Sequence, residues 1–448
     1  MQKVRPETPV GQRVRSGATH PGAPSRKEVR AWAMYDFANS AFTTLVVTFI
    51  FSQYYATVVH SDPVRGGVWW GRAVAGSAVA VALLMPVLGA AADEGGLKKR
   101  LLVLTTAACC VFTGALFFVG PGNALTGALI FVAANVAYEA AQVFYNAFLP
   151  EISTRRNVGR ISGFAWGLGY VGGLACLVVA LAMVRGQPAF VARLLPETDF
   201  LNVRATNLLT AAWVIVFAVP VFRHLKERVP RRPVRWASAG MVGLKRLRET
   251  ARDLRRYRQA VRFLIARLVY NDGLVTVFAM ASIYAAAVFG MDTAELIVLG
   301  IVVNLASGAS SIVFGFVNDR IGGKKTIAIS LVALSAVSTM AYLAQSLAAF
   351  WVAALLLGLM VGPNQSASRA LLSSFVPEGK QGELFGLYAF SGKLASVLGP
   401  LSYSAVLGAT GSHRWAMLSV AAFFLVGLAL LARVDEQEGI EAAARQAG

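Results

Sequence analysis

Six ionisable side chains stand inside long apolar runs of this chain of 448 residues. On insertion scales, a charged side chain at the centre of a membrane helix costs about 2.5–3.5 kcal/mol, so such a residue is a functional candidate by default. Together the two signs of charge suit proton transfer, ion pairing or the recognition of a charged ligand. The six residues are Asp36, Glu139, Arg267, Asp272, Arg369 and Lys393.

The two deepest carboxylates are the candidates for proton coupling, Asp272 first and Glu139 second. Burial raises the pKa of a carboxylate and a nearby cation lowers it, so changing surroundings let such a group bind a proton on one side and release it on the other. At 1.5 Å per residue, Asp272 lies roughly 15 Å into its apolar run. The alternative is a static ion pair, Asp272 with Lys393 or Asp36 with Arg267. Because Asp36 lies near the end of its run, it favours a pair that closes a gate.

Polar side chains in the same runs are candidates for substrate binding. Asn135, Tyr138 and Gln142 fall on one helix face at i, i+3 and i+7. Amides that converge on a cavity suit a small zwitterion or a polyol. The alternative is hydrogen bonding between helices, typically worth about 0.6 kcal/mol in a membrane protein. The other members of the set are Asn39, Asn271, and the pair Asn364 and Gln365 that follows Pro363.

Other kinds of chemistry find little support. The three cysteines lie inside apolar runs and the four histidines lie outside them, so no metal-ligand spacing is present. Residues 167–172 spell a dinucleotide fingerprint, but they lie within an apolar helix and follow no strand. The stretch 391–394 lacks the glycine and hydroxyl spacing of a phosphate loop. We therefore expect no metal, no cofactor and no enzymatic activity.

Twelve apolar stretches must position these side chains. The composition is 56% hydrophobic and only 15% charged, whereas a soluble domain is about 25% charged. Each stretch is roughly 20 residues long, the length a helix needs to cross about 30 Å of hydrocarbon. The sequence therefore predicts an all-α integral membrane protein with about twelve transmembrane helices. The expected segments are a disordered tail (1–30), a six-helix half (31–224), a basic linker (225–260), a second six-helix half (261–434) and a tail (435–448).

Lysine and arginine fall mainly in alternate loops between these helices. Residues 223–262 carry fourteen of them against three acids, whereas residues 120–123 and 290–295 carry none. The positive-inside bias predicts that both termini and the linker are cytoplasmic, in a cell (inner or plasma) membrane. The net charge of +19 is therefore an orientation signal, and we expect no nucleic-acid partner. With its interleaved leucines, segment 245–262 also fits an amphipathic helix on anionic lipid.

A charged turn between helices occurs twice and divides the chain into halves. Both copies read Gly-x-x-x-Asp-x-x-Gly-x-Lys-Lys, and their aspartates are 226 residues apart. A second repeat, Pro150-Glu151 and Pro377-Glu378, has an offset of 227 residues. Two six-helix halves in parallel repeat are typical of secondary transporters. The residues of the repeated turn are Gly89, Asp93 and Gly96 in the first copy and Gly315, Asp319, Arg320 and Gly322 in the second.

These turns resemble the signature loop of the major facilitator superfamily, and the second copy is the closer match. Residues 31–434 further resemble the bacterial relatives of the vacuolar amino-acid effluxers of autophagy, a branch of that superfamily. The resemblance is carried by stretches such as 32–42, 144–151, 270–273 and 362–365. It implies transport by alternating access through a cavity lined by helices one, four, seven and ten, and it favours efflux.

In the resembled fold, Asp93 faces the start of helix eleven near Gly382. An anion there can cap the positive end of that helix. We hypothesise that Asp93 is a latch that favours the outward-open state, with Asp319 as its weaker counterpart. The alternative is a solvated turn for which Gly95 and Gly96 supply the bend.

Together these features predict a secondary active transporter that exports a small polar solute, an amino acid or a similar zwitterion, and is coupled to protons. We expect it to work as a monomer. The alternatives are a multidrug or metabolite exporter and a non-transporting membrane receptor on the same scaffold. Drug antiporters carry a Gly-Pro pair in helix five, where this chain has residues 169–173 instead.

Overall fold

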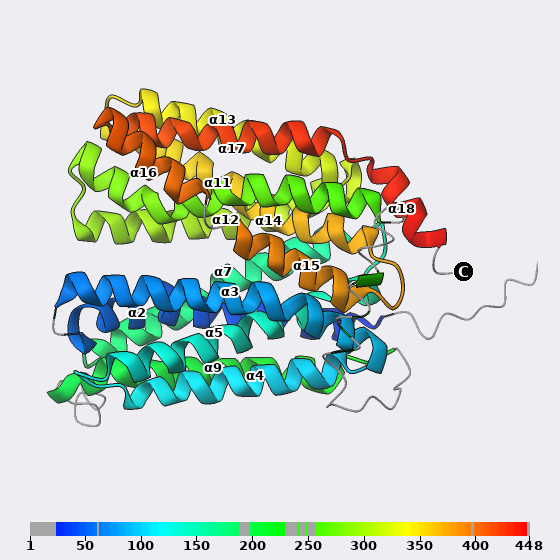
Figure 1. Ribbon diagram of the computed structural model, residues 1–448, viewed down its shortest axis with the longest axis horizontal. Coiled ribbons are helices and arrows are strands. Elements are labelled where there is room, and N and C mark those ends of the chain that lie inside the picture. Colours follow the sequence, from blue (N-terminus) through cyan, green and yellow to red (C-terminus); the bar gives the residue numbers. More distant parts are fainter. Residues whose placement is uncertain are drawn as a thin grey trace, which may run out of the picture.

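The computed structural model describes residues 24–60, 62–187, 198–228, 241, 243, 245, 248–249, 257–395 and 398–445. In this part of the chain, twelve helical spans are long and apolar enough to cross a membrane. Figure 1 shows them as two bundles that lie side by side along one long axis. The predicted all-α membrane fold is confirmed.

The N-terminal half contains the first six spans. Its first span begins as a regular helix and continues through π-helical turns, whereas the others are largely α-helical. Their elements are α1 (Arg26–Ala41) with η1 (Phe42–Phe49), α2 (Phe51–Tyr54) and η2 (Tyr55–Val59); α3 (Pro63–Gly95); α4 (Lys98–Ala115) with η3 (Leu116–Phe118); α5 (Ala124–Asn146) with α6 (Leu149–Ile152); α7 (Val158–Val184); and η4 (Thr198–Phe200) with α9 (Leu201–His224).

The C-terminal half repeats this plan and ends in a short surface helix. Its eleventh span is built from two helices in succession. The elements are α11 (Arg258–Phe289), α12 (Thr293–Ile321), α13 (Gly323–Leu343), α14 (Leu347–Phe375), α15 (Gln381–Leu394), α16 (Leu398–Thr410), α17 (His413–Ala432) and α18 (Glu436–Arg445).

The helix ends differ from the expected segments in two places. The first helix begins at Arg26 rather than at 31, because the Ser25 side chain caps it by accepting a hydrogen bond from the Glu28 N–H (3.1 Å). The expected tail 435–448 contains α18. Most of the linker, including the greater part of the expected lipid-binding helix over 245–262, lies outside the described residues.

The two halves meet along α3 with α15 and along α7 with α12. These crossings are close because small residues let the backbones touch. A Cβ atom on Gly89 would overlap the carbonyl oxygen of Gly382, and one on Gly163 would overlap that of Ser311. We call the end of the bundle that carries the turns at 89–99 and 315–325 the motif-loop side. Gly96 and Gly322 end their turns with φ of +58° and +93°, a backbone region that glycine enters without strain.

In the N-terminal half, the start of the third span is tied to the end of the sixth. Lys99 donates from Nζ to the carbonyl of Leu225 (2.6 Å), and its backbone N–H donates to the Glu227 carboxylate (2.7 Å). Arg228 then pairs with Glu28 in the first turn of α1 (2.9 Å). The beginning of the linker is thus fixed to the half that precedes it.

The C-terminal half repeats this clamp. Lys324 donates from Nζ to the carbonyl of Ala432 (3.1 Å). Glu436 accepts the backbone N–H groups of Gly323 (2.8 Å) and Lys324 (3.1 Å), the first residues of α13. Gln259, in the first turn of α11, bonds the segment that follows the twelfth span. Segment 432–438 is therefore the structural counterpart of the start of the linker.

We predict that Glu436→Ala destabilises the C-terminal half, because two N–H groups at the start of α13 lose their acceptor. The expected loss is about 1 kcal/mol, the usual cost of removing a helix cap. Thermal unfolding of the purified protein in detergent measures it. Glu441→Ala, on the exposed side of the same helix, is the control and should change the midpoint little. Equal midpoints for both variants would contradict the clamp.

Candidate functional site

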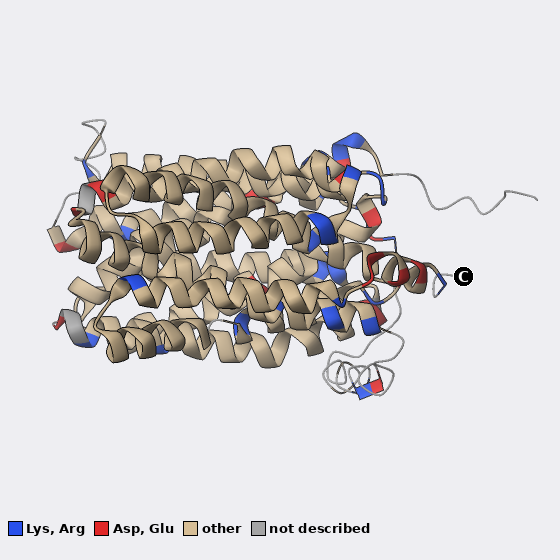
Figure 2. Ribbon diagram, turned by 90° about the horizontal axis from the view of Figure 1, so that it is seen from above, with Lys and Arg blue, Asp and Glu red and all other residues tan. Residues whose placement is uncertain are grey.

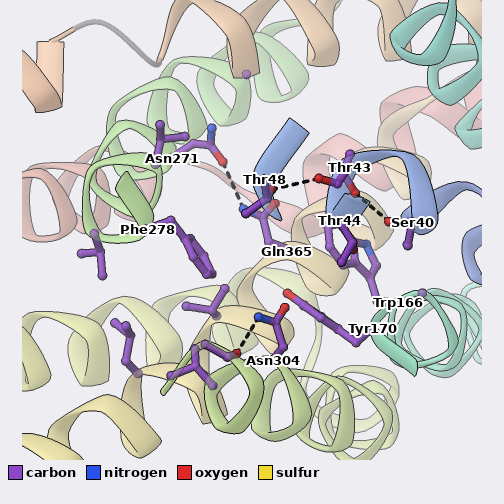
Figure 3. Close-up of a pocket in the computed structure, with 18 of the residues that line it drawn as sticks. Ser40, Thr43, Thr44, Thr48, Trp166, Tyr170, Asn271, Phe278, Asn304 and Gln365 are labelled. Carbon is purple, nitrogen blue, oxygen red and sulfur yellow. Dashed lines mark hydrogen bonds between the residues drawn. The ribbon is translucent and has the colours of Figure 1, made fainter. Parts of the chain in front are cut away.

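A cavity of about 700 Å³ lies between the two halves and takes its lining from both (Figure 3). Among the described residues, five charged side chains line it, and each lies in the part of its span nearer the motif-loop side. We call these five the charged floor: Asp36, Glu139, Arg267, Arg369 and Lys393.

Asp36 and Arg369 form the first ion pair of the floor. Arg369 Nη1 on α14 lies 2.9 Å from the Asp36 carboxylate on α1, so the pair joins the two halves. The same guanidinium donates to the Ser162 hydroxyl (2.9 Å) and the Ser162 carbonyl (2.8 Å) on α7. Trp32 lies against it, with its ring centroid 5.0 Å from the guanidinium carbon. Arg369 is therefore buried with its charge compensated and most of its donors used.

Glu139 and Lys393 form the second ion pair between the halves. Lys393 Nζ on α15 lies 2.5 Å from the Glu139 carboxylate on α5. The side chain of Lys393 is 27% exposed and that of Glu139 is 17% exposed. In the first pair the values are lower, 3% for Arg369 and 10% for Asp36. The Glu139 pair is therefore the more accessible of the two from the cavity.

Arg267 is the fifth charge of the floor, and its contacts stay within the C-terminal half. Its Nη1 donates to the carbonyl of Tyr388 (3.0 Å) and to the hydroxyl of Ser391 (2.9 Å). The guanidinium carbon lies 3.5 Å from the centroid of the Tyr388 ring, a close cation–π contact. Within the described part of the chain, no carboxylate pairs with Arg267.

Several predicted polar residues also line the cavity. Gln365 donates to Asn271 (3.2 Å), as Figure 3 shows, and Gln142 donates to the Tyr138 hydroxyl (2.8 Å). Asn39 lines it as well. The side chain of Asn39 is buried, and neither its amide nitrogen nor its oxygen has a hydrogen-bond partner among the described residues.

Three predicted residues lie away from the cavity. Asp272 accepts a hydrogen bond from the Gly399 N–H on α16 (2.8 Å) and is 1% exposed. It is five positions from Arg267, about 140° further around a helix of 3.6 residues per turn, so it faces another neighbour. Asn135 donates to Ser77 and Asn364 to Ser330, each at 2.8 Å, and these bonds join helices within one half.

The expected ion pairs were therefore wrong in their partners. Asp272 was matched with Lys393 and Asp36 with Arg267, whereas the structure pairs Glu139 with Lys393 and Asp36 with Arg369. Both observed pairs cross between the halves. Partner choice across that interface depends on how each helix is rotated, which the sequence does not state.

A row of hydroxyl groups lies on the first span, and the sequence draws attention only to its first member, Ser40, beside Asn39. These side chains line the cavity at spacings i, i+3, i+4 and i+8 (Figure 3). Thr48 donates to the carbonyl of Thr43 (2.9 Å), five residues earlier, as π-helical winding allows. The helical period of hydroxyls in an apolar run was the signal available in the sequence. The row consists of Ser40, Thr43, Thr44 and Thr48, and Trp166, Tyr170 and Asn304 are other lining residues that sequence reasoning missed.

The two repeated aspartates each cap a helix of the opposite half. Asp93 accepts the N–H groups of Gly382 and Glu383 at the start of α15, each at 2.9 Å. Asp319 accepts the N–H of Gly159 at the start of α7 (2.7 Å) and pairs with Arg160 (2.9 Å). Asp93 thus accepts two backbone N–H groups, whereas Asp319 accepts that of Gly159 and pairs with an arginine whose side chain is 48% exposed. That Asp319 is the weaker counterpart stays a prediction.

Arg320 follows the second of these aspartates and is exposed.

Together the two caps close the bundle on the motif-loop side. The cavity extends from the charged floor toward the opposite ends of the helices, where Thr48, Phe49 and Gly300 line it.

This fold is that of solved membrane transporters. The human organic anion transporter MFSD10 matches with a TM-score of 0.68 at 15% identity, over 92% of this chain and all of MFSD10. The major facilitator superfamily transporter FucP of E. coli, in its outward conformation, matches with a TM-score of 0.67 at 13% identity, over 92% of this chain and all of FucP. At these identities the matches show the fold, which is that of major facilitator superfamily transporters.

Within that superfamily, the chain belongs to the family described as vacuole effluxer Atg22 like, which matches residues 73–160 and 151–444. The uncharacterised MFS-type transporter YxiO of Bacillus subtilis is 28% identical over 94% of this chain and 97% of YxiO. Autophagy-related protein 22 of Yarrowia lipolytica is 24% identical over 68% of this chain and 55% of its own length. The chain thus spans about half the length of this fungal relative. The resemblance inferred from the sequence is confirmed.

We predict that Gly89→Ala opens the motif-loop side, because the new Cβ would overlap the Gly382 carbonyl and force α3 away from α15. Overpacking of this kind costs typically about 1–3 kcal/mol, a shift of roughly 5- to 150-fold between two states. Spin labels at Arg156 and Glu378, exposed on opposite halves, report the separation. Gly76→Ala on the same helix has open space and should leave the distance unchanged. An unchanged distance in Gly89→Ala would refute the packing argument.

Proposed function

We propose that this protein is a proton-coupled exporter of a small polar solute and works by alternating access. The observation that carries the proposal is the Glu139–Lys393 ion pair, which joins the two halves and lines the cavity. A carboxylate that binds a proton only by giving up an inter-half contact couples protonation to conformational change. A pair buried within one half would have no such effect.

The geometry supports an outward-facing state. Asp93 and Asp319 close the motif-loop side, and FucP, which has the same fold, was solved in an outward conformation. Figure 2 shows Lys and Arg gathered at the end of the bundle where the C-terminus lies. By the positive-inside bias we assign that end to the cytoplasm, in the cell membrane. The cavity would then face the outside.

In the proposed cycle, a proton enters the cavity from outside and neutralises Glu139. Lys393, which is partly buried, then loses the negative charge of Glu139, and this raises the electrostatic cost of its position. The contact between α5 and α15 weakens, the halves rock, and the motif-loop side opens. The proton leaves to the cytoplasm, solute enters from there, and the re-formed ion pair favours the return to the outward-facing state.

For the solute, we propose an amino acid or a similar small molecule that carries a carboxylate. The family's description as vacuole effluxers supports export. Amides and hydroxyls from both halves supply hydrogen bonds, and Phe278 and Phe350 supply apolar walls. A mostly apolar pocket with a few placed polar groups is the usual form of a small-molecule site.

Glu139 replaces Asp272 as the first candidate for proton coupling. Asp272 was preferred because of its depth, but it lies against α16, outside the cavity, and accepts a backbone N–H there. Glu139 lies at the interface that must open. Asp36 is the second candidate, since its pair with Arg369 also crosses between the halves.

We predict that Glu139→Gln abolishes the stimulation of transport by a pH gradient, because glutamine binds no proton and cannot pair with Lys393. Flux of radiolabelled alanine, glutamate, valine and phenylalanine in proteoliposomes, with and without the gradient, measures this. The variant's rate with a gradient should fall to the wild-type rate without one.

Asp272→Asn is the matched control, since its Oδ1 can still accept the Gly399 N–H. It should keep gradient stimulation. Full stimulation in Glu139→Gln would reject the coupling assignment, and loss of stimulation in Asp272→Asn alone would restore the earlier candidate. If none of the four compounds moves, the assignment of an amino-acid-like solute fails.

A further inference from the structure

We infer that the solute carries a net negative charge and that Arg267 binds its anionic group. The inference rests on the proposed transport function and sharpens its solute class from a zwitterion to a monoanion with a carboxylate. Hydroxy acids, oxo acids and N-acylated amino acids belong to this class.

The charge balance of the floor is the first observation. In their ordinary ionised forms, the two carboxylates and three cations that line the cavity leave one positive charge in excess. Asp36 compensates Arg369, and Glu139 compensates Lys393. Arg267 supplies the excess. A charge in a poorly solvated site is costly unless it is paired, so a bound anion restores the balance.

The hydrogen bonding of Arg267 is the second observation. The side chain is buried, with the residue only 6% exposed, and it lines the cavity. Tyr388 and Ser391 occupy Nη1, whereas Nε has no partner among the described residues. A guanidinium presents its donors as a fork that matches a carboxylate. Arg267 therefore has both an unpaired charge and an unused donor.

The third observation is Asn39, which belongs to the other half of the molecule. It lines the same cavity from α1, and neither polar atom of its buried amide has a partner among the described residues. Buried amides are normally hydrogen-bonded, so an amide without a partner on a residue that lines a cavity is a candidate for contact with a ligand group. A carboxylate or an α-hydroxyl suits such an amide.

The floor offers a carboxylate more than it offers an ammonium group. An ammonium ion is compensated by acceptors with negative charge, and both carboxylates of the cavity already bind cations at 2.5 Å and 2.9 Å. Binding a zwitterion leaves the excess positive charge in place, and binding a cation adds to it. Of these three classes, only an anion brings the floor to neutrality.

The test compares ligands that share a carbon skeleton and differ in charge. Valine, 2-hydroxy-3-methylbutanoate and valinol form one set; phenylalanine, 3-phenyllactate and phenylalaninol form another. Affinities for the purified full-length protein in detergent are measured by calorimetry at neutral pH. In at least one set the anion should bind about tenfold or more tighter than the zwitterion, and the amino alcohol weakest.

Arg267→Gln should weaken binding of the anion by about 10- to 100-fold, the usual effect of losing a hydrogen bond to a charged group, and should remove the preference for anion over zwitterion. Arg267→Lys keeps the charge and should retain part of that preference. Arg204→Gln is the matched control. Arg204 also donates to a carbonyl (2.7 Å, Phe117) beside an aromatic ring, but it lies outside the cavity.

Tighter binding of the zwitterion in both sets, an anion preference that survives Arg267→Gln, or no binding by any anion would each overturn the inference. The binding assay is independent of proton coupling. If anions bind through Arg267 but neither they nor the four amino acids show gradient-driven flux, the proposed function fails and the binding assignment stands. If flux is proton-coupled but the zwitterion binds tighter than the anion, the binding assignment fails and the proposed function stands.

Discussion

The constraint on which this structure depends is that a charge buried between membrane helices must find compensation. The chain meets it at the charged floor with ion pairs whose members belong to different halves. If Glu139 and Lys393 belonged to the same half, their ion pair would not depend on the position of the other half. Because they belong to different halves, moving the halves apart requires separating their charges. Anything that removes one of the two charges therefore changes the equilibrium between conformations.

The helix ends follow the same division. Within each half, a lysine and a glutamate join the third span to the sixth by hydrogen bonds, at Lys99 with Glu227 and at Lys324 with Glu436. Between the halves, single aspartates cap helix N-termini, where an anion is favoured by the unsatisfied N–H groups. A cap of this kind can be released because water can replace the carboxylate. The clamps thus fix helices within one half, whereas the aspartate caps join helices of different halves.

Much of the fold could be predicted from the sequence, because it depends on local patterns: apolar runs of spanning length, charged turns and a repeat offset. The site residues could also be predicted, since charge in an apolar run is rare. The side chains and helices that they contact could not be predicted. Asp272 and Arg267 differ by about 140° around one helix, and only the packing of α16 decides that Asp272 faces it. The hydroxyl row that includes Thr43 and Thr48 was visible as a helical period, yet hydroxyls are tolerated in apolar runs and carry less signal than charges.

In the mechanism that we propose, recognition and coupling use different residues, and this separation has a physical consequence. Arg267 is held by Tyr388 and Ser391, all within the C-terminal half, so a solute bound to it leaves both inter-half ion pairs intact. Protonation of Glu139 does the opposite: it breaks a pair without touching Arg267. A bound anion therefore neutralises the floor and lowers the cost of enclosing it, whereas a proton weakens the bond that keeps the floor closed. The anion and the proton thus change the charge balance of the floor in different ways. In the proposed exchanger, they can bind in alternation without touching each other.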